Sequence, residues 1–233
     1  MLNIKLTGIK GRNLREFLSH PKTLLYADFN VLNYLYEEKI QLPENIIAYP
    51  DSLAVYLGIK YLTKNPISKF VSTDFQDELL IFLINSNCKV FFFGDHKSVL
   101  DKLVVGLEYK YPGIIISGIH DGYIYETNNV IELINRSNAD ILFVGLGVRH
   151  QEKWIIENFN SLNCKLIISV GGWFQYLAHS KKRAPKFLRD LHLEWIHKLV
   201  MEFGRVWTRY FFGVPLFFYR IITKKIIIDY DGD

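Results

Sequence analysis

The sequence predicts an α/β protein in which a Rossmann-like parallel sheet is flanked by helices and followed by a C-terminal helical appendage. Short apolar runs rich in β-branched and aromatic residues alternate with longer amphipathic stretches, as in a parallel sheet covered on both faces. Glycines follow several of these runs, where the strands of such a sheet end. Near residue 189 this pattern gives way to a basic segment rich in aromatic residues.

Each expected element follows from its local pattern. The apolar runs predict strands at Thr23–Phe29, Asn45–Tyr49, Lys89–Phe93, Ile114–Ser117, Ile141–Leu146 and Leu166–Val170. The amphipathic stretches predict helices at Ser52–Leu62, Asp74–Ser86, Lys97–Tyr111, Asn128–Ser137 and His150–Phe159. No repeat or low-complexity linker interrupts residues 1–188, so we expect one core domain over 1–188 and an appendage over 189–233.

The C-terminal segment carries the basic charge of the chain. Residues 181–225 contain eleven Lys and Arg against three Asp and Glu, whereas the whole chain has a net charge of +4. This local excess predicts an anionic partner, which can be a diphosphate, an acidic lipid surface or a nucleic acid. Leu191–Phe203 has the pattern of an amphipathic helix, and Arg205–Ile222 mixes arginines with large apolar residues. Its apolar run is far shorter than the roughly 20 residues that cross a bilayer, so we expect a membrane-associating segment, with a helix packed on the core as the alternative.

Other features concern compartment and metals. Cys88 and Cys164 each lie in or beside an expected buried strand, so we expect no disulfide, no zinc site and a reducing compartment. The N-terminus lacks the apolar core of a secretory signal, which favours a cytoplasmic protein. Asp229, Asp231 and Asp233 have Asp-x-Asp spacing but stand at the end of the chain, and we interpret them as a disordered acidic end. We therefore expect no bound metal and no cofactor.

The strongest local motif is the glycine turn Gly145-Leu146-Gly147, which ends an apolar run and precedes the polar residues Arg149 to Glu152. Free N–H groups at such a helix start can hold a phosphate or carbonyl oxygen, and Gln151 can hydrogen-bond a sugar or a base. The same residues suit a tight strand-to-helix turn with a capped, solvated first turn. Spacing supports both interpretations equally, because a lone Gly-x-Gly lacks the full dinucleotide-binding fingerprint.

Two further motifs stand at expected strand ends. Gly171-Gly172 would let a ligand approach the backbone, and the basic cluster that includes Arg183 follows ten residues later. Taken alone, this motif reads more simply as a flexible loop before a solvated helix. Asp51 precedes an expected helix, where its carboxylate can cap the helix or take a proton from a hydroxyl; spacing favours the cap, and the roles are compatible.

Taken together, these segments resemble the WecG/TagA/CpsF family of glycosyltransferases over nearly the whole chain. The most specific part of the resemblance is the combination of four short motifs at their intervals. These are Gln151-Glu152, Gly171-Gly172, Arg183-Ala184-Pro185 and Glu194-Trp195. Further matching segments are Phe93-Gly94, Tyr111-Pro112, Gly122-Tyr123, Ala139 to Leu142, Gly145 to Lys153, Glu202 and Arg205.

The resemblance implies an inverting, metal-independent transfer from a UDP-sugar to a polyprenyl-diphosphate-linked saccharide at the inner membrane face, for exopolysaccharide, capsule or teichoic acid. Asp51 matches the aspartate of a Pro-Asp-Gly motif, the family's candidate base, although the glycine is Ser52 here. Asn30 matches a Thr-x-Asn motif in which Asp28 replaces the threonine, and Arg149-His150 replaces Pro-Lys. The implied donor-binding residues are Gly94, Gly145, Gly147, Arg149, Gln151, Glu152, Gly171, Gly172, Arg183, Arg205 and Arg209.

Two other interpretations compete with this one. A basic segment with interleaved aromatics can bind nucleic acid, but no recognition-helix, zinc or RNP pattern accompanies it, so no nucleic-acid partner is expected. A catalytically lapsed member acting as a partner subunit is the alternative function, motivated by Asp28 and Ser52 at the two departures from the family pattern. The sequence leaves open the sugar, the acceptor and the oligomeric state, a homo-oligomer included.

Overall fold

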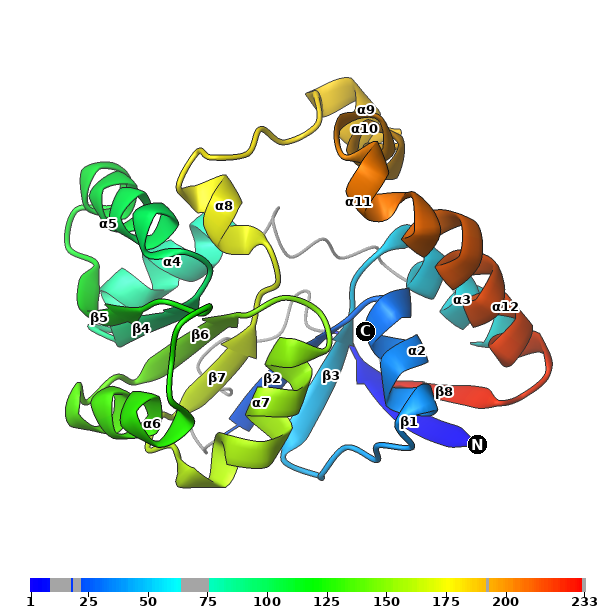
Figure 1. The fold of residues 1–233 in the computed structure, drawn as a ribbon, viewed down its shortest axis with the longest axis horizontal. Helices are drawn as coiled ribbons and strands as arrows, with labels where there is room; N and C mark the ends of the chain where they lie inside the picture. Colours follow the sequence, from blue (N-terminus) through cyan, green and yellow to red (C-terminus); the bar gives the residue numbers. More distant parts are fainter. Residues whose placement is uncertain (9–17, 19–21, 64–75, 192, 232–233) are drawn as a thin grey trace.

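A computed structural model of the chain contains an eight-stranded parallel sheet with helices on both faces (Figure 1). It describes residues 1–8, 18, 22–63, 76–191 and 193–231. The strand order is β5-β4-β6-β7-β2-β3-β1-β8, and the neighbouring strands run parallel. The strands are β1 (Leu2–Thr7), β2 (Lys22–Ala27), β3 (Ile46–Pro50), β4 (Lys89–Gly94), β5 (Ile115–His120), β6 (Ile141–Gly145), β7 (Leu166–Ser169) and β8 (Ile226–Asp231). The predicted α/β class is confirmed.

Two hydrophobic cores, one on each face of the sheet, hold the helices in place. One face carries α2 (Phe29–Glu37), α3 (Leu53–Thr63), α6 (Thr127–Arg136), α7 (His150–Asn158) and α12 (Val214–Ile222). The other carries α4 (Gln76–Asn85), α5 (Lys97–Lys110) and α8 (Trp173–Leu177). The six predicted strands and five predicted helices correspond to β2 to β7 and α3 to α7; the predicted start of α4 at Asp74 lies outside the described residues.

The predicted strand Thr23–Phe29 is too long, because the chain turns at Asp28 and α2 begins at Phe29. The Asp28 carboxylate accepts hydrogen bonds from the backbone N–H groups of Asn30 (2.8 Å) and Val31 (2.9 Å), which is the usual N-cap arrangement. An aspartate at the end of an apolar run therefore marks a helix start here that the sequence pattern did not predict.

The interpretation of the C-terminus as a disordered acidic end is wrong for Asp229 and Asp231, because both lie in β8. β8 pairs with β1 from Leu2↔Ile226 to Thr7↔Asp231. Ile226 and Ile228 point into the core while Ile227 and Asp229 are exposed, and this alternation of buried and exposed residues is typical of a strand with one buried face. The chain thus returns to the sheet after α12, so residues 189–233 contribute a strand to the core; Asp233 lies outside the described residues.

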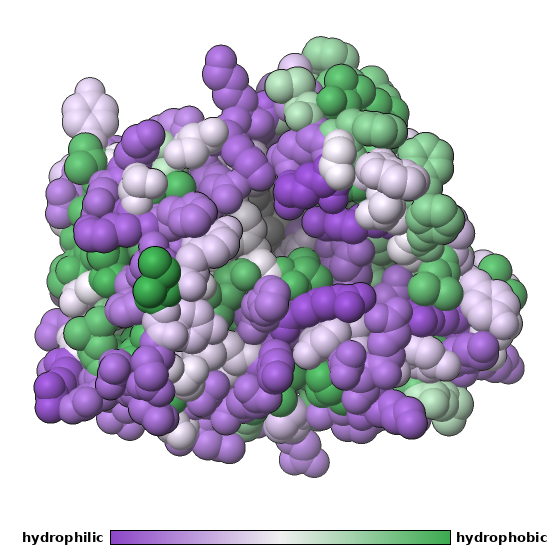
Figure 2. All heavy atoms as spheres, in the orientation of Figure 1, coloured by the Kyte–Doolittle hydropathy of each residue, from purple (hydrophilic) through white to green (hydrophobic). Residues whose placement is uncertain are grey.

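Between the core and β8, the chain forms α9 (Lys186–Asp190), α10 (Glu194–Met201), α11 (Phe203–Thr208), a π-helical turn η3 (Arg209–Gly213) and α12, along one side of the molecule (Figure 1). α12 buries Phe217 and Ile221 against the core and exposes its opposite face. Figure 2 shows a green, hydrophobic area at the upper right, over this region. The exposed large hydrophobic residues of segment 187–222 are Phe187, Leu191, Trp195, Ile196, Val200, Met201, Phe203, Trp207, Phe211, Phe212, Leu216, Tyr219 and Ile222. None of the helices within the described part of the chain has the length and apolar character needed to cross a bilayer.

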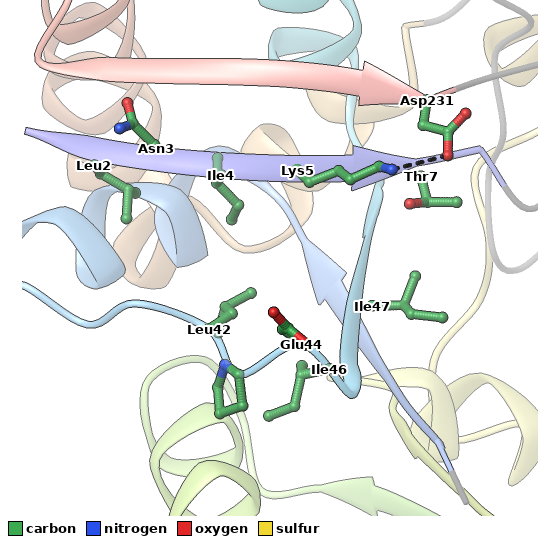
Figure 3. A pocket seen from close by; sticks show the side chains of 11 residues that line it. Leu2, Asn3, Ile4, Lys5, Thr7, Leu42, Glu44, Ile46, Ile47 and Asp231 are labelled. Carbon is green, nitrogen blue, oxygen red and sulfur yellow. Dashed lines mark ion pairs between the residues drawn. The ribbon is translucent and has the colours of Figure 1, made fainter. Parts of the chain in front are cut away.

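A pocket of about 500 Å³ lies between β1 and β3 (Figure 3). It exists because these strands pair only at Leu6↔Ala48 and diverge from there, leaving Leu2, Ile4 and Ile46 along its walls. Lys5 forms an ion pair with Asp231 at its rim, at 3.1 Å. None of the predicted site residues lines this pocket.

Candidate active site

A second pocket, of about 330 Å³, lies at the carboxyl ends of the strands, where open α/β sheets bind their ligands. Residues in or shortly after β2, β3, β4, β5, β6 and β7 line it, together with residues of α8, of the loop after it, of α10, of α11 and of η3. Figure 2 shows this face of the molecule hollowed near its centre. The lining residues are Tyr26, Asp51, Asp95, Gly122, Tyr123, Gly145, Leu146, Gly147, Val148, Val170, Gly171, Gly172, Trp173, Gln175, Tyr176, Lys181, Lys198, Glu202, Arg205 and Arg209.

Asp51 lines this pocket directly after β3. Ser52 stands between Asp51 and the helix, and its Oγ accepts a hydrogen bond of 3.4 Å from the Val55 N–H. Ser52 has a φ of +92°, a backbone conformation that glycine adopts without strain and other residues rarely adopt. This conformation gives a physical reason for the glycine that the family has at this position.

Asp28 is buried just after β2. It caps α2 through the backbone N–H groups of that helix, and it also accepts hydrogen bonds from side chains. The Tyr26 hydroxyl donates to Asp28 Oδ2 at 3.1 Å, and Asn30 Nδ2 donates to the same oxygen at 3.0 Å. Arg209 Nη2 lies 3.5 Å from that oxygen, which brings η3 against the end of β2. Burial, followed by the charges of Asp28 and Asp51, raises the pKa of Tyr26 well above its usual value, so this hydroxyl stays protonated and donating. Asp28 therefore orients Asn30 and Arg209 and does not line the pocket.

The two glycine turns shape the opposite side of the pocket. Gly147 and Gly171 have φ values of +83° and +55°, and a Cβ at either would meet nothing within 4 Å, so the backbone conformation requires glycine and the space above it stays open. Gly94 has a different role, since a Cβ on it would lie 2.4 Å from the Gly145 backbone. Gly94 lets β4 and β6 approach each other, and it lies outside the pocket lining.

Gln151 and Glu152 lie beneath these turns and are fully buried. Gln151 Nε2 donates to Glu152 Oε1 at 2.6 Å, and the Gly171 N–H donates to Gln151 Oε1 at 3.0 Å. The Arg149 N–H donates to Glu152 Oε2 at 2.5 Å. Burial raises the pKa of Glu152 to about 7. These contacts join the Gly145–Arg149 turn to the Gly171–Gly172 turn. That Gln151 and Glu152 also contact the donor stays a prediction.

Four cationic side chains line the pocket, namely Lys181, Lys198, Arg205 and Arg209. Lys181 Nζ lies 3.1 Å from Glu202 Oε1, and Arg205 Nε donates to Glu202 Oε2 at 2.7 Å. These two cations lower the pKa of Glu202 against the opposing effect of burial. Burial alone would lower the pKa of Lys198, but Tyr176, Tyr210, Glu194 and Asp51 around it raise it, so Lys198 stays charged.

Two predicted arginines lie elsewhere. Arg183 is directed to Glu194 of α10, with 3.9 Å between Nη2 and Oε2, and does not line the pocket. Arg149 is directed to Glu37 of α2, at 3.1 Å, and lines a neighbouring groove together with Asn30. Among the predicted residues, the structure brings Asp51, Gly145, Gly147, Gly171, Gly172, Arg205 and Arg209 to one pocket.

Lys198, Lys181 and Tyr26 are pocket residues that the motif analysis did not select. Lys181 belongs to the basic cluster already noted, and it lines the pocket while Arg183 does not; that Arg183 binds the donor stays a prediction. Lys198 stands on an amphipathic helix, where a lysine is ordinarily a solvated residue, and no local signal distinguished it. Tyr26 is hidden in an apolar run that reads as a buried strand. Within the described residues, no group of three or more His, Cys, Asp or Glu side chains is arranged to hold a metal ion.

Comparison with known proteins gives the same result as the motifs. The model of the family described as "Glycosyl transferase WecG/TagA/CpsF family" matches residues 39–229. Among curated proteins, the chain is similar to one of Staphylococcus aureus (strain MW2) named N-acetylglucosaminyldiphosphoundecaprenol N-acetyl-beta-D-mannosaminyltransferase. The two are 29% identical over 223 residues, which cover 91% of this chain and 86% of the relative. A protein with the same name from strain NCTC 8325 / PS 47 is 28% identical over the same shares. Because the family model matches residues 39–229, which is most of the chain, this protein belongs to the WecG/TagA/CpsF family of glycosyltransferases.

Proposed function

We propose that this chain transfers a sugar from a UDP-sugar to a polyprenyl-diphosphate-linked saccharide during the synthesis of a bacterial cell-surface polysaccharide. The transfer inverts the anomeric centre and needs no metal ion. The observation that carries the proposal is that one pocket joins the Asp51 carboxylate to four cations, Lys181, Lys198, Arg205 and Arg209. The names of the Staphylococcus aureus relatives, which act on a diphosphoundecaprenol-linked N-acetylglucosamine, support the class of acceptor.

The cationic side of the pocket suits the diphosphate of the donor. Arginine binds phosphate oxygens through its planar fork, and lysine supplies a compact charge, so together they stabilise the negative charge that develops on departing UDP. Glu202 neutralises only part of this charge, since it is shared by Lys181 and Arg205. The open glycine turns at Gly147 and Gly171–Gly172 leave the backbone accessible to the nucleotide. In this arrangement protein cations supply the charge that a divalent ion supplies in other transferases.

Asp51 is the base in the proposed reaction. Its carboxylate takes the proton from the acceptor hydroxyl as that oxygen bonds to the anomeric carbon from the face opposite UDP. The bond between the anomeric carbon and the diphosphate oxygen breaks, and its electron pair leaves with UDP. Lys198 and Tyr26 line the same pocket, and both interact electrostatically with Asp51. Attack from the opposite face inverts the configuration.

The exposed apolar side chains of α9 to α12 suit attachment to the inner face of the cytoplasmic membrane. Phe211 and Phe212 are 60% and 65% exposed on η3, close in sequence to Arg209. An amphipathic surface of this kind lies at the headgroup boundary and is strengthened by nearby lysines such as Lys224. Arg220 of the same segment is buried against α2 and does not take part. This attachment would bring the pocket to the level of a lipid-linked acceptor.

The test is a panel of UDP-sugars with a polyprenyl-diphosphate-linked N-acetylglucosamine acceptor, reading UDP release with and without EDTA. We expect release with one donor, unchanged by EDTA. Asp51→Asn should lower turnover by about a factor of 10² to 10⁴ without weakening UDP binding, because it removes only the proton acceptor. Lys198→Gln should instead weaken UDP binding.

Near-normal turnover of Asp51→Asn would rule out the base assignment. Absence of release from folded wild-type protein with every donor would favour the alternative function, a lapsed enzyme acting as a partner subunit.

A further inference from the structure

A groove of about 480 Å³ lies on the far side of Arg205 and Arg209 from the UDP pocket. The start of α2, the turn before α7 and the segment from α11 to α12 form its walls. Val148, Arg205 and Arg209 line both spaces. The groove and the pocket are therefore neighbours that share one cationic wall, and a molecule in the groove has one end beside the reacting groups.

The groove carries excess positive charge. Arg149, Arg205 and Arg209 line it, and Glu37 is the only acid among the described residues that do so. Glu37 is already shared, because Arg149 and the buried Arg220 each lie 3.1 Å from one of its oxygens. The Arg149 side chain is 59% exposed, so its pair with Glu37 is a weak surface pair that an incoming anion can replace.

The groove also has an apolar part. Phe212 and Leu216 line it and are 65% and 38% exposed. Both belong to the apolar surface that we propose lies on the membrane. A groove lined by both cations and exposed apolar side chains matches a molecule in which a diphosphate stands between a sugar and a hydrocarbon chain.

We infer that this groove binds the diphosphate of the lipid-linked acceptor, with Arg149 as the cation that serves the acceptor alone. The hydrocarbon chain leaves past Phe212 and Leu216 toward the membrane, and the acceptor sugar lies on the side of Asn30 and the shared wall. This inference rests on the proposed function and deepens it by separating two diphosphate sites, one for the donor and one for the acceptor. It also moves Arg149 from the donor, where the family resemblance put it, to the acceptor.

The experiment measures binding and transfer separately in neutral detergent micelles. A short polyprenyl diphosphate is the probe for the groove, and UDP is the probe for the pocket. Arg149→Gln should weaken binding of the polyprenyl diphosphate about tenfold and leave UDP binding unchanged. It should raise the KM for the lipid-linked acceptor by a similar factor with little change in kcat or in the KM for the donor.

Two controls isolate the charge at this position. Lys153→Gln removes a positive charge from the same helix, but Lys153 is exposed and pairs only distantly with Glu157, at 3.9 Å, so no constant should change. Arg149→Lys keeps the charge and should recover most of the binding.

With an acceptor in which an uncharged alkyl chain replaces the diphosphate, wild type and Arg149→Gln should have equal KM values.

Each contrary outcome is distinct. Equal binding of the polyprenyl diphosphate by wild type and Arg149→Gln would overturn the groove assignment even if transfer is intact. Weaker UDP binding by Arg149→Gln would indicate that Arg149 binds the donor, and it would overturn the assignment of Arg149 to the acceptor. A defect seen only with vesicles of anionic phospholipid, and absent in neutral micelles, would make Arg149 a membrane-headgroup contact. Failure of transfer with every acceptor, with the polyprenyl diphosphate still bound through Arg149, would overturn the proposed reaction and leave the binding site in place.

Discussion

Replacing Arg220 with alanine should weaken the packing of α12 on α2, because Arg220 forms buried contacts between these two helices. Arg220 Nη1 donates to the Asn33 carbonyl oxygen at 3.2 Å and to Asn33 Oδ1 at 2.9 Å, and Nη2 donates to Glu37 Oε1 at 3.1 Å. The guanidinium also lies over the Tyr36 ring, 4.5 Å from its centroid. Asn33 Nδ2 in turn donates to the Gly213 carbonyl oxygen at 2.9 Å, at the end of η3.

The magnitude follows from which of these bonds are buried. The two bonds to Asn33 are buried and have a charged donor, and such bonds contribute about 1.5–3 kcal/mol each. The two bonds to Asn33 share the Nη1 nitrogen, so together they contribute little more than one full bond. The Glu37 side chain is one-third exposed, so solvent screens its ion pair, and we add only the ring contact. The expected loss for Arg220→Ala is about 3 kcal/mol, which lowers the midpoint of thermal unfolding by about 6–12 °C for a chain of this size.

Thermal and urea unfolding of Arg220→Ala, followed by far-UV circular dichroism, provide the measurement. Arg220→Lys should recover less than half of the loss, because an ammonium group cannot reach Asn33 and Glu37 in the same plane. Lys224→Ala, which removes an exposed cation two residues beyond α12, is the matched control and should change the midpoint by less than about 2 °C. A loss below about 1 kcal/mol for Arg220→Ala would refute the claim that this contact holds the C-terminal helices on the core.

Three further predictions concern strain, pH and the membrane. Ser52→Gly should stabilise the fold by about 1 kcal/mol, since φ at position 52 is +92°; a lower unfolding midpoint would mean that the weak Ser52 cap outweighs the strain. Burial raises the pKa of Glu152 to about 7 from 4.5, so the folded state holds its proton more tightly. The contribution of Glu152 to the free energy of unfolding should therefore be highest below pH 4.5, and it should fall by about 3 kcal/mol as the pH rises to about 7. Glu152→Gln should lack that part of the pH dependence. If urea unfolding shows the same loss of stability between pH 5 and pH 8 for the variant as for the wild type, the assignment is contradicted. Replacing Phe211 and Phe212 together with serine should weaken binding to anionic vesicles at least about tenfold, while Tyr109→Ser, which replaces an even more exposed aromatic on α5, should have no effect in the same flotation assay.

The sequence determined the parts of this protein that depend on local pattern. Six strands and five helices follow from apolar runs and amphipathic stretches, because a parallel sheet buried on both faces needs continuous apolar strands. The short motifs indicated the family and located Asp51, Arg205, Arg209 and the glycine turns, since each lies at a strand end or in a segment of unusual charge. β1, β8 and α2 were not predicted. β8 ends in alternating aspartates, and its identity depends on pairing with a strand more than two hundred residues away.

Only the tertiary structure decided which side chains share a space. Gln151 and Glu152 look like ligand-binding residues in a polar helix start, yet the fold buries them under the glycine turns as hydrogen-bonding partners of Gly171 and Arg149. Lys198 looks like a solvated lysine on an amphipathic helix, yet the packing of α10 turns it into the pocket beside Asp51. Arg149 is adjacent in sequence to residues of the pocket that Asp51 lines, but its positive φ and its pair with Glu37 direct it into the neighbouring groove. The physical reason is the same in each case: periodicity sets which face of an element is buried, whereas the direction and neighbours of a polar side chain depend on contacts with distant parts of the chain.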